Sequence, residues 1–342
     1  MTRTTRAFLL LPVALFLGCQ QDTLAPKTDS PASGPVFAKP GPTPPPADPA
    51  IAFVVGSDIW VMNADGSNQR LVVAGGDAPN FSPDGAQLTF TSSIAGPGVY
   101  VINIDGTGLR KVVGTIAGGG PAWSPVPAPD GQMKIAYTDL PGPPDGTLEG
   151  NNSDIFLVNL DGTGRVNLTN TRELTEGHPT WSPSATRLAA QPVRYSGTDV
   201  GVKVGILVYD LGVVGGSVTI TGQTNVTAAG PLSSAYTVFR PAWAKTQDKL
   251  AVVVFETGSS LRDIWVIDLA VPANPTNITR TPSVSENMPS WSPNDTRIAY
   301  QQLNSKNRPS IFTMNADGSG VTEIGNPSRG LTSQSQPDWR RF

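Results

Sequence analysis

The chain of 342 residues is mildly acidic, with 24 basic and 27 acidic side chains and a formal net charge of −3. This balance gives no electrostatic footprint for a phosphate backbone, so no nucleic-acid partner is expected. A hydrophobic content of 38% is enough for a large core, and the 36 glycines and 33 prolines fall mostly between short apolar runs, a pattern typical of strands joined by tight turns.

The first 18 residues have the form of an export signal. Arg3 and Arg6 precede an apolar run, residues 7–17, which is shorter than the roughly 20 residues that a membrane-spanning helix requires. The run ends in Phe16-Leu17-Gly18-Cys19, which resembles the lipobox of bacterial lipoproteins. The resemblance implies that residues 1–18 are a lipoprotein signal peptide and that Cys19, the one cysteine of the chain, is lipidated.

Residues 19–50 are rich in proline, serine, alanine and aspartate. Such a segment buries too little apolar surface to fold, and its prolines favour an extended chain of roughly 3.1 Å per residue. We therefore expect a lipid-anchored tether that holds a folded body in the periplasm or outside the cell. Gln20, rather than an aspartate, follows Cys19, which favours the outer membrane of a bacterium.

A sixfold repeat dominates the remainder of the chain. Its first copy starts at Asp58 and reads Asp-Ile-Trp-Val-Met-Asn-Ala-Asp-Gly. Altered copies start at residues 98, 154, 205, 263 and 310, so neighbouring copies lie about 40 to 58 residues apart. This spacing is in the range in which propeller blades repeat.

The unit around the second copy reads as four strands. Residues 79–81 begin an innermost strand, and residues 88–91, 99–103 and 109–113 supply the other three. Apolar residues alternate with small or polar ones most clearly in the third strand, as expected where one face packs on a neighbouring sheet. The Ser-Pro-Asp-Gly and Asn-x-Asp-Gly turns place proline and glycine where tight turns need a fixed or a positive φ.

One aromatic residue occupies the same place in the innermost strand of every unit. These anchors are Phe81, Trp123, Trp181, Trp243, Trp291 and Trp339. A large ring at one fixed position per sheet predicts a wedge between adjacent blades, and therefore a core position.

Both ends of the repeat are incomplete, and they complement each other. Residues 51–55 form a second-type strand without an inner neighbour, whereas Trp339 is an inner anchor near the end of the sequence. We expect residues 339–342 to pair with residues 51–55, because this pairing closes the ring and removes two exposed sheet edges. The predicted fold is therefore all-β: over residues 51–342, a monomeric six-bladed β-propeller of four-stranded antiparallel blades, closed by pairing of the C-terminal strand with the N-terminal blade.

Two motifs carry a family resemblance. Pro-x-Trp-Ser-Pro followed by a strand, then Asp-Ile-Trp-Val-Met-Asn-Ala-Asp-Gly, resembles the WD-repeat-like β-propeller of the TolB family, periplasmic proteins of the Tol–Pal system. The resemblance covers residues 51–342 and implies this fold and a place in the cell envelope. Members of that family carry an additional N-terminal α/β domain, where this chain has the predicted tether.

Few catalytic arrangements are compatible with this sequence. A single histidine excludes His-x-x-x-His zinc motifs, the one cysteine is assigned to the signal, and neither a Gly-x-Ser-x-Gly elbow nor a phosphate-binding glycine loop is present. The Asn-x-Asp-Gly turns lack the glutamate that completes an EF-hand calcium loop. Asp58, Asp154 and Asp263 either face the central channel or support a turn, and we expect the structural role. We predict no catalytic residue, no metal and no cofactor.

His178 is the best candidate for a role beyond structure. It precedes an innermost strand, where the chain enters at the mouth of the central channel, and the equivalent positions are Ala78, Gly120, Arg240, Met288 and Gln336. His178 and Arg240 are then neighbours across a blade boundary, with Glu176, Glu286 and Asn287 near the same rim. Such a set can titrate or bind an anionic ligand. The alternative is a hydrogen-bonded structural histidine.

The connections that vary in length gather at one end of the blades, which we call the loop face. They are residues 139–153, 193–203, 256–262 and 303–309 within blades, and residues 169–178, 221–240 and 326–336 between blades. Tyr195 and Tyr236 lie among them, and the mixture of aromatic and charged side chains suits a protein or peptide partner.

Two functions remain open at this point. The first is a non-enzymatic, lipid-anchored interaction module that docks a protein or peptide on the loop face. The second is a carbohydrate-binding protein or a lyase-type enzyme that uses the central channel near His178 and Arg240, an analogy from fold alone.

Overall fold

The computed structural model describes residues 50–341 apart from 115–118, 142–151, 172–173, 197–198, 204, 234–235, 257–258, 260 and 326–333. The side chains of residues 119 and 194–203 are also outside the description. The predicted signal, Cys19 and the tether therefore lie outside the described residues. Within the described part of the chain, no helix is long and apolar enough to cross a membrane.

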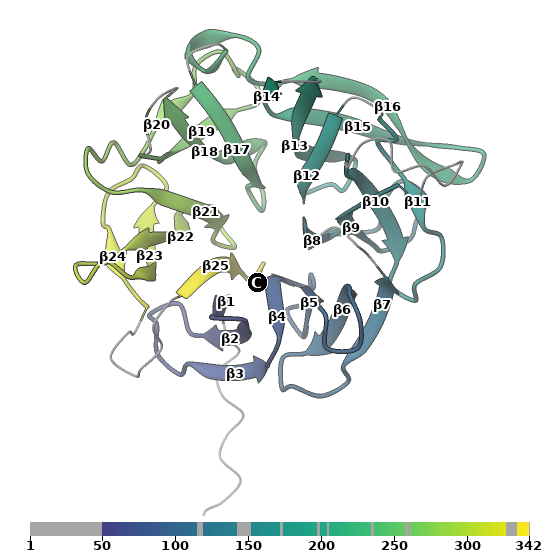
Figure 1. Cartoon of the computed structure of the whole chain (residues 1–342), viewed down its shortest axis with the longest axis horizontal. Helices are drawn as coiled ribbons and strands as arrows, with labels where there is room; N and C mark the ends of the chain where they lie inside the picture. Colours follow the sequence, from purple (N-terminus) through teal and green to yellow (C-terminus); the bar gives the residue numbers. More distant parts are fainter. Residues whose placement is uncertain are drawn as a thin grey trace, which may run out of the picture. The chain divides into compact units, whose positions relative to one another are not determined.

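Six antiparallel sheets make up the folded unit, and Figure 1 shows them arranged around a common centre. Blade 1 consists of β25 (Gln334–Trp339), β1 (Ile51–Val55), β2 (Asp58–Met62) and β3 (Arg70–Val73), and blade 2 of β4 (Gly76–Phe81), β5 (Gln87–Ser92), β6 (Gly98–Asn103) and β7 (Arg110–Gly114). Blade 3 consists of β8 (Gly119–Trp123), β9 (Lys134–Asp139), β10 (Asp154–Asn159) and β11 (Val166–Asn167).

Blade 4 consists of β12 (Leu174–Trp181), β13 (Arg187–Ser196), β14 (Asp199–Lys203), β15 (Leu207–Val214) and β16 (Ser217–Asn225). Blade 5 consists of β17 (Tyr236–Trp243), β18 (Lys249–Glu256), β19 (Asp263–Asp268) and β20 (Thr276–Asn277), and blade 6 of β21 (Glu286–Trp291), β22 (Arg297–Leu303), β23 (Pro309–Asn315) and β24 (Thr322–Glu323). The predicted six-bladed β-propeller is confirmed.

The ring closes through blade 1, as the sequence predicts. β25 pairs antiparallel with β1, with Ile51 opposite Trp339 and Val55 opposite Gln334. The boundary of the closing strand was wrong: it runs from Gln334 to Trp339 and does not start at Trp339. The reason is general, because the anchor is the last residue of the inner strand in every blade.

The aromatic anchors connect each blade to its neighbour through hydrogen bonds. All six are buried, as predicted. In four blades the anchor's backbone N–H donates to the side chain that precedes the neighbouring anchor, over 2.7–3.1 Å: Phe81 to Asp338, Trp123 to Asn80, Trp243 to Thr180 and Trp339 to Ser290. In the other two, the neighbour has alanine at that place, and the indole Nε1 donates to the alanine carbonyl: Trp181 to Ala122 over 3.0 Å and Trp291 to Ala242 over 3.1 Å. Six hydrogen bonds therefore link the blades in a circle.

The repeated aspartates have structural partners. In the Asn-x-Asp-Gly turns, Asp65, Asp105, Asp161 and Asp317 each accept hydrogen bonds from the backbone N–H and the hydroxyl of a serine or threonine two residues later. Asp58 accepts from the backbone N–H of Gly75, and Asp154 and Asp263 accept from side chains and backbone in the following outer connection. These contacts confirm the expected turn support.

Blade 4 departs from the predicted connections. Part of residues 193–203, expected to be a loop, continues the sheet, because β13 extends to Ser196 and β14 pairs back onto it. Residues 221–240 likewise contain the end of β16, a 3₁₀ turn at Gly230–Leu232 and the start of β17. Their β-branched and aromatic residues favour strands, so only a shorter stretch is irregular.

The circle of hydrogen bonds leads to a stability prediction. Asp338→Ala removes the acceptor of the Phe81 amide and the ion-pair partner of Lys245, whose Nζ lies 3.7 Å from Asp338 Oδ1. Because a buried donor and a buried cation lose their carboxylate, we expect a loss of about 2–5 kcal/mol in the free energy of unfolding. Chemical denaturation measures it, with Glu256→Ala on the surface as control; equal effects of the two variants would contradict the circle's role.

Candidate binding site at the channel mouth

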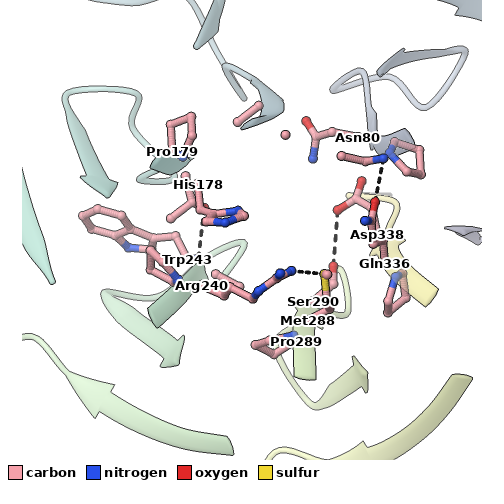
Figure 2. Close-up of a pocket in the computed structure, with 18 of the residues that line it drawn as sticks. Asn80, His178, Pro179, Arg240, Trp243, Met288, Pro289, Ser290, Gln336 and Asp338 are labelled. Carbon is pink, nitrogen blue, oxygen red and sulfur yellow. Dashed lines mark hydrogen bonds between the residues drawn. The ribbon is translucent and has the colours of Figure 1, made fainter. Parts of the chain in front are cut away.

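The centre of the ring holds a cavity of about 420 Å³. It is lined by the same three-residue segment of every inner strand, a variable residue followed by proline and a third residue: 78–80, 120–122, 178–180, 240–242, 288–290 and 336–338. Figure 2 shows these side chains converging from the blades on one space. The six-residue set that the sequence aligned with His178 therefore surrounds one cavity.

Each inner strand is distorted at this segment. The register between the inner strand and its neighbour shifts there in all six blades. In five blades the residue before proline has a left-handed backbone: Ala78, His178, Arg240, Met288 and Gln336, with φ from 52° to 54°. This conformation costs a non-glycine residue of order 1–3 kcal/mol, so the packing around these five residues must hold their backbone in place. Backbone strain of this kind is concentrated at functional sites.

Arg240 is the main cation at the mouth. Its guanidinium Nη1 donates to the Met288 sulfur, a weak acceptor, and its backbone N–H donates to Gln191 Oε1 over 3.2 Å. Among the described residues, no carboxylate forms an ion pair with it. Burial lowers its pKa, the charge of Arg262 lowers it further, and only Asp77 opposes them. Arg240 is therefore a partly desolvated cation that lacks a strong acceptor in the described structure.

His178 lies beside Arg240 at the same mouth, as Figure 2 shows. Burial lowers the pKa of its imidazole to about 4, and the positive charge of Arg240 adds to this effect. At neutral pH the imidazole is therefore uncharged. The pair presents one positive charge and a neutral ring that can donate or accept a hydrogen bond.

The cavity lining also includes Lys245 and Asp338, which the sequence did not predict as site residues. Burial lowers the pKa of Lys245, and Asp338 opposes that shift. Because Asp338 also accepts from Phe81 and Ser290, this pair is part of the ring's framework. Lys245 replaces the proline of the Ser-Pro turn that follows most anchors. This departure from the repeat is the feature of the sequence that could have identified Lys245 as a site residue.

Several predicted site residues lie elsewhere. Glu176 and Glu286 are fully buried at blade junctions, where their carboxyl groups are hydrogen-bonded to the hydroxyls of Thr171 and Thr281, and neither lines the cavity. The backbone distortion at the residue before proline explains this, because it breaks the two-residue alternation that would put Glu176 and His178 on one side.

The remaining three also lie off the cavity or outside the description. Asn287 accepts from the Met288 N–H and does not line the cavity. Tyr236 packs on Trp265, with ring centroids 5.7 Å apart. The side chain of Tyr195, in β13, is outside the described part of the structure.

The channel mouth and the loop face coincide. β12 begins at the end where β13 finishes, with Leu174 opposite Arg194, and β17 begins opposite the end of β18, with Tyr236 opposite Glu256. The connections between blades and between second and third strands therefore emerge at the end of the ring where the inner strands begin. His178 and Arg240 lie within β12 and β17, so the expectation that His178 precedes its strand was wrong.

Comparison with known structures agrees with this architecture. TolB from Acinetobacter baumannii is 19% identical over 86% of this chain and 67% of that one, with a TM-score of 0.64. The putative TolB from Agrobacterium tumefaciens is 17% identical over 81% and 89%, with a TM-score of 0.54. A chain of the nidogen/laminin complex is 14% identical over 84% and 97%, with a TM-score of 0.56. No family model and no curated protein matches the sequence.

The fold and the mouth together define the class. The protein is a six-bladed β-propeller of the TolB-like type, with a cavity at the centre of the ring.

The state of His178 can be measured directly, because it is the one histidine of the chain. In protein without a histidine tag, we expect its imidazole resonances to titrate near pH 4, and to move to higher pH in Arg240→Met, because the neighbouring positive charge is lost. Nuclear magnetic resonance follows this single residue. A midpoint near 6.5 in the unmodified chain would contradict a buried, neutral imidazole.

Proposed function

We propose that the protein is a lipid-anchored, monomeric interaction module of the bacterial cell envelope, on the outer membrane, that binds a protein or peptide on its loop face. The export signal with Cys19 and the tether support the location. The TolB-like propeller supports a binding role, because propellers commonly bind through loops displayed on a rigid ring. No catalytic residue and no cofactor are part of this proposal.

The observation that carries the proposal is the state of Arg240. A guanidinium has five donors arranged to match a carboxylate, and here its one described acceptor is a thioether. A carboxylate from a ligand would displace that weak contact and compensate a desolvated charge. The proposed partner therefore presents an acidic side chain or a chain terminus to the cavity.

Neutral His178 supports the second candidate. A carbohydrate-binding protein or lyase that acts on an acidic sugar needs a cation for the sugar carboxylate, and a lyase needs a base as well. Arg240 and an unprotonated His178 supply those chemical types inside the cavity. Incubation with oligosaccharides of acidic sugars separates the two functions, because product formation that is lost in His178→Ala would favour the enzyme.

Selection from a random peptide library tests the leading function. We expect the unmodified protein to enrich acidic peptides, and Arg240→Met to bind them about 10- to 100-fold more weakly in calorimetry, because a charge-assisted hydrogen bond is lost. Arg110→Met, which changes an exposed arginine on the outer strand β7, away from the loop face and the cavity, is the matched control. Equal affinities for the unmodified protein and Arg240→Met would remove the cavity from the binding site.

A second variant tests the assigned face. Shortening the connection between β16 and β17, which emerges beside the mouth, should reduce binding of the selected peptides. Unchanged binding would show that the partner docks elsewhere on the ring.

A further inference from the structure

Two blade junctions contain a pair of buried carboxyl groups that the proposed function does not use. At the junction of blades 3 and 4, Asp154 of β10 and Glu176 of β12 share the hydroxyl of Thr171. At the junction of blades 5 and 6, Asp263 of β19 and Glu286 of β21 share the hydroxyl of Thr281 in the same way. Glu176 and Glu286 have no exposed surface.

In each pair, the aspartate carboxylate accepts several hydrogen bonds from the protein. Asp154 accepts from Asn167 Nδ2 over 2.6 Å and from the Thr171 N–H over 3.1 Å, and Asp263 accepts from Asn277 Nδ2 over 2.7 Å and from the Thr281 N–H over 3.1 Å. The aspartates are therefore the members of the pairs that have the larger number of hydrogen-bond donors.

The glutamates have too few donors to be ionised. Thr171 Oγ1 lies 3.0 and 2.9 Å from the two carboxyl oxygens of Glu176, but its single hydrogen can be given to one acceptor, and the Leu174 carbonyl competes at 3.2 Å. If Glu176 is protonated, its carboxyl group donates to Thr171 Oγ1, and the Thr171 hydroxyl then donates to the Leu174 carbonyl. The same count holds for Glu286, whose Oε2 has no partner among the described residues.

Among the residues that the structure describes, none around the pairs supplies a compensating cation. Tyr209 faces Glu176 and Asp154, and Tyr300 faces Glu286; both are neutral phenols whose pKa is raised by burial and by these carboxyl groups. Arg262 contributes its carbonyl, which accepts from the Glu286 N–H, while its guanidinium lies over the ring of Phe239. None of the described ion pairs includes Glu176 or Glu286. An unpaired buried carboxylate is costly, so protonation is the favourable state.

The pKa values follow this geometry. Burial raises the pKa of Glu176 to about 8, opposed by the Thr171 hydroxyl and reinforced by Asp154. Burial raises the pKa of Glu286 to about 7, opposed by Thr281 and reinforced by Asp263.

A third junction shows the neutral version of the same arrangement. At the junction of blades 6 and 1, Ser310 is the second residue of β23 and Gln334 the first of β25, in the places of the aspartate and the glutamate. Both are buried. An amide there needs no proton, so this junction is a natural reference for the other two.

We propose that the Glu176–Asp154 and Glu286–Asp263 pairs are proton-operated latches, each of which holds one proton at the acid side of neutrality and loosens its blade junction when the proton leaves. The latches lie where they can act on the mouth. Glu176 is two residues before His178 and Glu286 two before Met288, whose sulfur accepts from Arg240. The ring therefore tightens in acid and loosens in alkali, whether or not the mouth binds an acidic partner.

The sign follows from linkage. Each glutamate has a higher pKa in the folded chain than in the unfolded one, so the folded state binds more protons in the interval between the two values. Latch stabilisation is complete below about pH 4.5, and it is lost as the pH rises to about 8 at Glu176 and about 7 at Glu286. In that interval, each latch raises the unfolding constant by up to about tenfold per pH unit.

Unfolding of the full-length chain from pH 5 to pH 9 tests the proposal. We expect Glu176→Gln and Glu286→Gln together to remove this part of the pH dependence, so that the double variant gains stability relative to the unmodified chain as the pH rises. Glu256→Gln, an exposed glutamate at the end of β18, should leave the pH dependence unchanged. Gln334→Glu should add a further loss of stability at high pH, since it places a third buried carboxyl group opposite Ser310.

A double variant whose stability runs parallel to that of the unmodified chain over the whole range would overturn the proposal. Carbon-13 resonances of labelled glutamate carboxyl groups give an independent measurement on the folded protein. Two should titrate above pH 6 in the unmodified chain and disappear in the double variant, and their absence would also overturn it. Because neither measurement uses a ligand, its failure is separate from failure of the proposed binding function.

Discussion

The structure depends on the contact between the aromatic anchor of each inner strand and the inner strand of the preceding blade. A propeller blade buries its faces only against its neighbours, so the ring is stable when every junction is made, including the one between the last strand and the first. Here each junction has the bulk of an anchor and a hydrogen bond that the anchor itself donates, from its backbone N–H where the neighbour offers a side-chain acceptor and from its indole where the neighbour offers alanine. The blades are therefore joined in the same way by two kinds of hydrogen bond, one from the backbone N–H and one from the indole.

This constraint also shapes the channel mouth. The residue two before each anchor is proline, and the residue before that proline is driven into a left-handed or distorted conformation at the edge of the cavity. The framework therefore fixes the backbone of six positions while leaving their side chains free to vary. Arg240 and His178 occupy two of those positions, and the ring absorbs the strain that they introduce.

The sequence predicted what repeats, because repetition is the physical requirement of a ring. The blade count, the buried anchors and closure through β1 and β25 all follow from that requirement and are confirmed. It also aligned the six mouth positions correctly. It misplaced Glu176 and Glu286, because the backbone distortion at the residue before proline is not visible as a break in alternation. Lys245 and Asp338 were missed because their importance comes from contacts between blades that are distant in sequence.

The central functional claim is that Arg240 receives an anionic group at the mouth of the channel. A crystal structure of the protein grown with a hexaglutamate peptide tests it most directly. We predict a carboxylate hydrogen-bonded to the Arg240 guanidinium, with the contact to the Met288 sulfur displaced. An empty mouth with the peptide bound on the outer strands or on the face opposite the loops would contradict it.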